Sequence, residues 1–177
     1  MLRSNIAYLF PFLLMLVFSC AGQTRNSDRF PEILGWVSDY DNLYTPSEKH
    51  SLDSLLTSFE KQTTIEIALV TLRPDMLKAD STSLKKYSLA MANEWRVGKK
   101  DTNNGILIAI SNTYRNIRIN NGYGIEEVIT DEETKEIIDN GFLPDFKKGK
   151  MYEGTFNGIK CLMSKLVENM DKKNIRF

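Results

Sequence analysis

Three long segments of the chain place apolar residues at the spacing of an amphipathic helix. The first follows Thr45-Pro46-Ser47-Glu48, which has the spacing of a capping box with proline at the first helical position. The second spans about residues 81–97, with Gly98 placed as a left-handed stop, and the third spans about residues 151–170. The stripe positions are Leu52, Leu55, Leu56 and Phe59; Leu84, Tyr87, Ser88, Met91 and Trp95; and Phe156, Ile159, Met163, Leu166 and Met170. Each segment therefore predicts a helix with one buried face.

Two further segments have the pattern of buried strands. Residues 64–72 contain an almost continuous apolar run, which is typical of a central strand buried on both faces. Residues 106–110 form a second such run, the turn at 111–114 reverses it, and Ile117 and Ile119 alternate with polar residues, so a hairpin is predicted. Thr130 and Glu133 have a second capping-box spacing and predict a helix that ends near Gly141.

The order of these elements predicts an α/β fold. Strands and helices alternate, and a hairpin and further helices follow. This order suits an α/β/α sandwich, a small mixed sheet flanked by helices on both faces. The length suits one domain, which we place at residues 33–171 with a tail at 172–177.

The first twenty residues have the layout of a signal peptide. Arg3 supplies a positive charge, and residues 6–18 form an apolar stretch too short to remain as a membrane-spanning helix. The stretch ends in Leu16-Val17-Phe18-Ser19-Cys20, which has the pattern of a lipobox. We predict removal of residues 1–19, a lipid on Cys20 and a linker over residues 20–32. An ordinary secretory signal cut nearby is the alternative.

A lipid on Cys20 would hold the chain on the cell membrane or the outer membrane, with the domain facing the periplasm or the exterior. Removal of residues 1–19 takes only Arg3 from the 23 basic side chains, against 23 acidic ones, so the domain is close to neutral. Binding of nucleic acid is therefore not expected. With Cys20 lipidated, Cys161 has no disulfide partner and is expected to be a core thiol in the last helix.

Several catalytic classes have no signature in this chain. It lacks a Walker-type loop, a Gly-x-Ser-x-Gly elbow, a His-Glu-x-x-His pair and a Cys-x-x-Cys pair. The single histidine, His50, falls on the polar face of the first helix and is expected to be solvated. Asp39-Tyr40-Asp41-Asn42 superficially matches the start of an aspartyl-phosphate phosphatase, but that mechanism needs a larger doubly wound sheet than this chain predicts.

Acidic residues gather on both sides of the predicted hairpin. Asp101, Asn103 and Asn104 precede it, and a second group follows Gly122-Tyr123-Gly124, namely Glu126, Glu127, Asp131, Glu132 and Glu133. Oxygen ligands from loops, without histidine or cysteine, are those that Ca²⁺ or Mg²⁺ prefers. The alternative is that the acids at 131–133 lie in the first turn of a helix, where the helix dipole favours them without any metal.

Five motifs, in order and at sensible spacings, resemble the TPM domain family. They lie at 37–48, 65–71, 95–108, 118–126 and 144–151, and include Val37-Ser38-Asp39, Trp95-Arg96-Val97-Gly98, Asn103-Asn104-Gly105 and Gly122-Tyr123-Gly124-Ile125-Glu126. The family is named for a thylakoid acid phosphatase, a photosystem II repair protein and a modulator of levamisole receptors. The resemblance implies an α/β/α sandwich that serves as an extracytoplasmic accessory domain of membrane complexes. Some members bind Ca²⁺, and phosphatase activity has been attributed to others.

By this resemblance, Asp39, Asn104 and Glu126 occupy family positions, whereas Asn103 replaces the usual aspartate and Asp101 lies two residues earlier. With Asp131, the residues Asp39, Asp101, Asn104 and Glu126 are our predicted metal ligands, and Ca²⁺ is the predicted cofactor. We expect a membrane-anchored extracytoplasmic lipoprotein that serves as a Ca²⁺-binding accessory or interaction module for a protein partner at the cell envelope.

Two alternatives remain open. One is a metal-dependent acid phosphatase, in which a bound cation polarises phosphate and Asp39, Asp101 or Glu126 acts as the base. The other is a structural protein-binding domain with neither metal nor activity, for which Tyr123 and Phe142 would be exposed contact residues.

Overall fold

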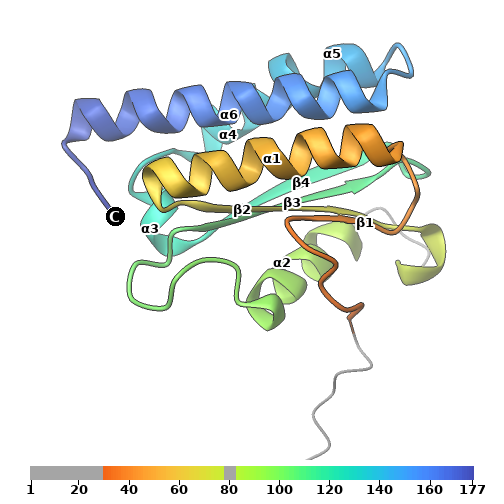
Figure 1. The fold of residues 1–177 in the computed structure, drawn as a ribbon, viewed down its shortest axis with the longest axis horizontal. Coiled ribbons are helices and arrows are strands. Elements are labelled where there is room, and N and C mark those ends of the chain that lie inside the picture. Colours follow the sequence, from red (N-terminus) through yellow and green to blue (C-terminus); the bar gives the residue numbers. More distant parts are fainter. Residues whose placement is uncertain (1–29, 78–82) are drawn as a thin grey trace, which may run out of the picture.

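The computed structural model describes residues 30–77 and 83–177 and arranges them around a four-stranded sheet (Figure 1). The strands β1 (Val37–Asp39), β2 (Glu66–Thr71), β3 (Gly105–Ser111) and β4 (Asn116–Asn121) lie side by side in that order. β1, β2 and β3 are parallel, and β4 pairs with β3 in the antiparallel direction. The predicted mixed sheet and hairpin are thus confirmed. The predicted signal peptide and Cys20 lie outside the described residues.

Helices cover both faces of the sheet, which confirms the predicted α/β/α sandwich. α1 (Pro46–Thr63) and α6 (Met151–Lys173) lie on one face, and α2 (Ser83–Trp95) lies on the other (Figure 1). The shorter elements are η2 (Pro74–Met76), α3 (Tyr123–Glu126), α4 (Asp131–Ile137), the π-helical turn η3 (Ile138–Phe142) and α5 (Leu143–Phe146). No helix within the described ranges is both long and apolar enough to cross a membrane.

The two connections between the parallel strands have opposite hands. Both move the chain in the same direction across the sheet, from β1 to β2 and from β2 to β3. The first passes through α1 on one face and the second through α2 on the other. One of them is therefore the uncommon left-handed crossover.

The sheet separates two apolar clusters. The larger one lies under α1 and α6 and receives Ile106, Ile108 and Ile110 of β3, whereas the smaller one lies under α2 and receives Leu107 and Ala109. Successive residues of a strand face opposite sides, so a strand between two helical layers needs apolar side chains on both. This is why every residue of β3 is buried.

Both predicted capping boxes are formed. Thr45 accepts a hydrogen bond from the backbone of Glu48 at 3.3 Å, and the carboxylate of Glu48 accepts one from the backbone of Thr45 at 2.7 Å. Thr130 and Glu133 make the equivalent pair of bonds, each 3.1 Å long. The first turns of α1 and α4 are therefore fixed by local sequence.

Two predicted helix ends differ from the structure. α2 ends at Trp95 rather than near Val97, because Arg96 already adopts a left-handed φ of 53° before Gly98 does so at 96°. The helix expected to end near Gly141 continues through η3 and α5. Gly141 is not a stop, because it does not adopt the left-handed φ of a helix end. A Cβ at this position would lie 3.1 Å from the Cα of Gly158, so its role is close packing against α6.

The predicted burial of Cys161 is wrong, and so is the exposure of Phe142 that the structural alternative expected. Cys161 is exposed and not a core thiol, because Leu162 and Met163 take the neighbouring inward positions of α6. Phe142 is fully buried and not an exposed contact residue, because its ring packs directly over Gly158 of α6. Tyr123, by contrast, is 79% exposed.

The last residues of the predicted linker contact the domain. The ring of Phe30 lies 5.1 Å from that of Tyr87 of α2, measured between centroids. The indole N–H of Trp95, at the end of α2, donates to the carbonyl of Pro31 at 3.0 Å. The chain therefore enters the domain along α2.

Candidate functional site

Asp39 ends β1, at the edge where the three parallel strands present their carboxyl ends. Its carboxylate accepts the backbone N–H groups of Leu43 and Tyr44, both at 3.0 Å. The hydroxyl of Thr71, at the end of β2, donates to the same carboxylate at 2.5 Å. Asp39 thus joins two strands to the loop that leads into α1, and both of its oxygens are bonded within the fold.

Asn104 is completely buried, just before β3. Its side-chain oxygen accepts the backbone N–H of Lys99 at 2.9 Å, and its side-chain nitrogen donates to the carbonyl of Thr64 at 2.6 Å. The carboxylate of Glu66 supports the same loop by accepting the N–H of Gly98 at 2.9 Å. Asn104 therefore holds the loop at 98–103 against the end of α1.

Asp101 and Glu126 are both exposed and come from segments that touch each other. The backbone N–H of Gly124, in α3, donates to the carbonyl of Asn103 at 3.1 Å. A Cβ at Gly124 would lie 2.1 Å from the carbonyl oxygen of Thr102, so only glycine permits this approach. The loop that carries Asp101 and the short helix that carries Glu126 are therefore packed together.

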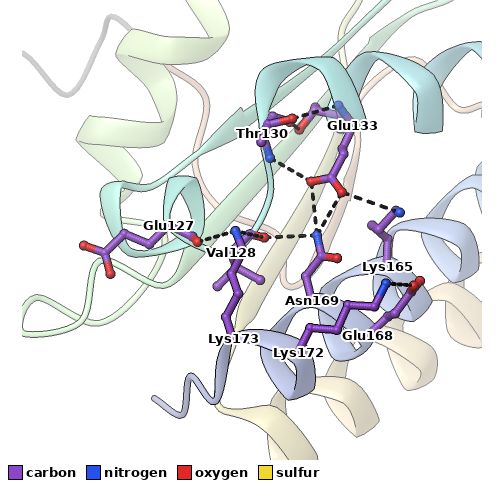
Figure 2. Close-up of polar contacts among 10 residues, drawn as sticks. Glu127, Val128, Thr130, Glu133, Lys165, Glu168, Asn169, Lys172 and Lys173 are labelled. Carbon is purple, nitrogen blue, oxygen red and sulfur yellow. Dashed lines mark hydrogen bonds and ion pairs between the residues drawn. The ribbon is translucent and has the colours of Figure 1, made fainter.

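Asp131 is the first residue of α4 and its side chain is exposed. The neighbouring acid that makes contacts is Glu133, whose two carboxylate oxygens lie 3.2 and 3.1 Å from the side-chain nitrogen of Asn169 (Figure 2). Lys165 forms an ion pair with Glu133 at 3.5 Å. The backbone N–H of Thr130, followed by Asn169 and Lys165, holds the pKa of Glu133 below its ordinary value.

The same polar network fastens the segment before α4 to α6. Asn169 is 6% exposed and also donates to the carbonyl of Val128 at 3.1 Å. The ammonium of Lys173 reaches the carbonyls of Glu127 and Val128 at 2.9 and 3.2 Å (Figure 2). These bonds satisfy backbone groups that precede α4, so the network stabilises the fold.

The five predicted metal ligands are not brought together. Asp39 lies where the parallel strands have their carboxyl ends, whereas Asp101 and Asn104 precede β3 and lie where the strands have their amino ends. Over residues 30–77 and 83–177, no group of three or more histidine, cysteine, aspartate or glutamate side chains is placed to hold a metal ion. Asp101 and Glu126 are the two predicted ligands that are exposed and belong to segments in contact.

A groove beside β4 was not predicted from the sequence. It is lined in part by Arg115, Arg118 and Lys147, none of which is a predicted site residue. The alternation of Ile117 and Ile119 with polar residues does indicate that this strand ends the sheet. It does not indicate which later segment would lie beside it.

An α/β/α domain built on a four-stranded mixed sheet is the class of protein that this fold defines. A comparison with family models matches residues 37–165 to the TPM domain. The chain therefore belongs to the TPM domain family. None of the curated proteins searched matches it.

Solved structures of similar fold come from several bacteria. The N-terminal domain of a P. gingivalis protein is 26% identical, with a TM-score of 0.67 over 77% of this chain and 84% of that one. The BA42 protein of Bizionia argentinensis is 19% identical, with a TM-score of 0.62 over 73% of this chain and 86% of that one. The N-terminal domain of a Corynebacterium glutamicum protein is 15% identical, with a TM-score of 0.54 over 76% and 82%. The last two likenesses concern the fold alone.

Proposed function

We propose that this chain is an extracytoplasmic lipoprotein, held on a membrane by a lipid on Cys20, whose TPM domain serves as a binding module in the cell envelope. The observation that carries the proposal is Leu16-Val17-Phe18-Ser19-Cys20 at the end of an apolar stretch that follows Arg3. The family match begins at residue 37, after a mostly polar segment. A diacylglyceryl thioether together with an N-acyl chain exceeds the two signals that stable anchoring needs.

The anchor is tested by fractionation of cells that express the full chain. We expect the wild-type chain in the membrane fraction after washing at high salt and alkaline pH, and the Cys20→Ser chain outside it. Cys161→Ser is the matched control, because Cys161 is exposed in the folded domain and its loss should leave the fractionation unchanged. Retention of the Cys20→Ser chain in the washed membranes would contradict the proposal.

We further propose that Ca²⁺ binds where the loop at 98–103 meets α3, with Asp101 and Glu126 as ligands. The two segments are joined by the bond from Gly124 to Asn103, and Asp101 and Glu126 are both exposed. Carboxylate oxygens are ligands of the kind that Ca²⁺ prefers. Asp39 and Asn104 are left out, since their side-chain groups are already bonded within the fold.

Calorimetric titration of the full chain with Ca²⁺, in a non-ionic detergent, tests this site. We expect saturable heat on addition of Ca²⁺. Asp101→Asn and Glu126→Gln should each lower the affinity for Ca²⁺ at least tenfold, because each removes one of the two charged ligands. Glu153→Gln is the control, as Glu153 is an exposed acid on α6. Absence of heat at millimolar Ca²⁺, or equal binding by all variants, would refute the site.

A further inference from the structure

The free edge of β4 is a feature that the proposed Ca²⁺ site and lipid anchor leave unused. β4 is the last strand of the sheet, and no strand among the described residues pairs with its outer side. Gly122, which follows β4, donates its backbone N–H to the carbonyl of Gly105 at 2.8 Å. The backbone groups of an antiparallel strand alternate in direction, and this bond shows that those of Gly122 point toward β3. Residues at odd-numbered positions of β4 have the opposite direction, so the N–H and C=O groups of Ile117 and Ile119 point away from β3. An edge of this kind is a template for another extended chain.

Two cavities follow this edge, with volumes of about 600 and 540 Å³. Both are lined by Arg115, Ile117 and Leu143, so they adjoin at the start of β4. One continues toward Lys147, and the other continues along β4 to Asn120 and α4. We call the two cavities together the edge groove. The groove lies between β4 and the segment that runs from α4 to α5, and at its far end Asn121 of β4 donates to Thr134 of α4 at 3.0 Å.

One side of the edge groove is apolar. Ile117 and Ile119 face the larger apolar cluster, as the alternation along β4 requires. Three half-buried side chains from the facing segment pack against the same cluster and line the groove, namely Ile138, Leu143 and Phe146. A strand added to β4 would therefore place every second side chain against apolar surface.

The other side of the edge groove is basic. Arg118 lies between Ile117 and Ile119, so it points to the face that α2 covers, and Lys85 of α2 lines the same cavity. Within the described part of the chain, Lys85 and Arg118 on this side, and Arg115 and Lys147 elsewhere in the groove, have no acidic partner within ion-pair distance. The acids that line the groove are Asp131 and Asp139, and Asp139 is paired with Lys135 at 2.5 Å.

We propose that the edge groove binds an extended peptide in which apolar and acidic residues alternate, and that this peptide pairs with β4 as a fifth strand. Main-chain hydrogen bonds to Ile117 and Ile119 would supply affinity, and the two faces of the groove would select the side chains. The inference rests on the proposed role as a binding module, for which it names the partner's chemistry. It is independent of the lipid on Cys20 and of Ca²⁺.

A fluorescent synthetic peptide of alternating valine and glutamate, added to the full chain in non-ionic detergent, tests the proposal by anisotropy. We expect saturable binding that is lost when lysine replaces glutamate. We also expect N-methylation of one alternate set of amides to weaken binding at least tenfold, whereas methylation of the other set is tolerated. Equal binding of both methylated peptides, or none of the parent peptide, would overturn strand pairing.

Matched variants locate the contact. Arg118→Glu should weaken peptide binding at least tenfold, whereas Lys86→Glu, which alters an exposed residue next to Lys85 outside the groove, should not change it. Circular dichroism confirms that both variants fold. Equal affinity in the two variants would overturn the assignment. A chain that dimerises through β4, and binds no peptide, would assign the edge to a second copy and would likewise overturn it. The Cys20→Ser fractionation result is unaffected by either outcome.

Discussion

Asp39 and Glu133 both accept backbone N–H groups near the start of a helix, but only the bonds between Glu133 and Thr130 belong to a motif that can be recognised in a sequence. Glu133 closes a capping box with Thr130, three residues away, and such a spacing can be found in a sequence. Asp39 accepts a bond from Thr71, and these two residues lie side by side only because β1 pairs with β2. The bonded state of Asp39 could therefore not be predicted, and it entered the predicted ligand set as a free carboxylate.

The lowered pKa of Glu133 predicts a dependence of stability on pH. The folded chain holds this carboxylate ionised more strongly than the unfolded chain, so its stabilising effect is present above its ordinary pKa of about 4.3. The effect is lost as the pH falls through the lower pKa of the folded state. We expect Glu133→Gln to lower the free energy of unfolding by about 1–2 kcal/mol near neutral pH and by less in acid.

Urea unfolding from about pH 6 to about pH 3 measures this difference. Glu168→Gln is the control, because the ion pair of Glu168 with Lys172 joins side chains that are 50% and 66% exposed. Such exposed pairs contribute little, so its effect should be smaller. A constant difference between wild type and Glu133→Gln over the whole pH range would contradict the role given to Glu133.

At the scale of elements, the periodic segments were predictable and the close packing between them was not. α1, β2, β3, β4 and the first turn of α4 follow from apolar spacing, capping boxes and β-branched runs. The π-helical turn η3 and the burial of Phe142 depend on Gly158, which lies in another helix. A sequence pattern gives the inward face of each helix, but not where a glycine of one helix will admit a ring from another.

Gly158→Ala tests the packing of η3 on α6. A Cβ at this position would lie 2.3 Å from ring atoms of Phe142, which is too close for any real contact. Overpacking of this kind typically costs about 1–3 kcal/mol, so we expect a corresponding loss in the free energy of unfolding. The double variant Gly158→Ala with Phe142→Leu should recover part of the loss, since leucine frees space. Lys160→Ala, at an exposed position of α6, is the control, and an equal effect there would contradict the packing argument.

At the scale of the whole molecule, the sandwich architecture was predictable because each layer has its own sequence period. The hands of the two crossovers were not, since a helix pattern does not say which face of the sheet it will cover. The edge groove was not predictable either, because it lies between β4 and a segment whose course is set by α6. The layers of the fold were thus predictable, whereas the groove between β4 and the segment from α4 to α5 was not.

The proposed lipid on Cys20 determines where the whole molecule is held, and the intact mass of the chain extracted from membranes shows whether that lipid is present. We expect a chain that begins at Cys20 and carries the added mass of a diacylglyceryl group and an N-acyl chain. The Cys20→Ser chain should lack that mass. An unmodified wild-type chain, or one cut at another position with Cys20 free, would refute the lipid anchor.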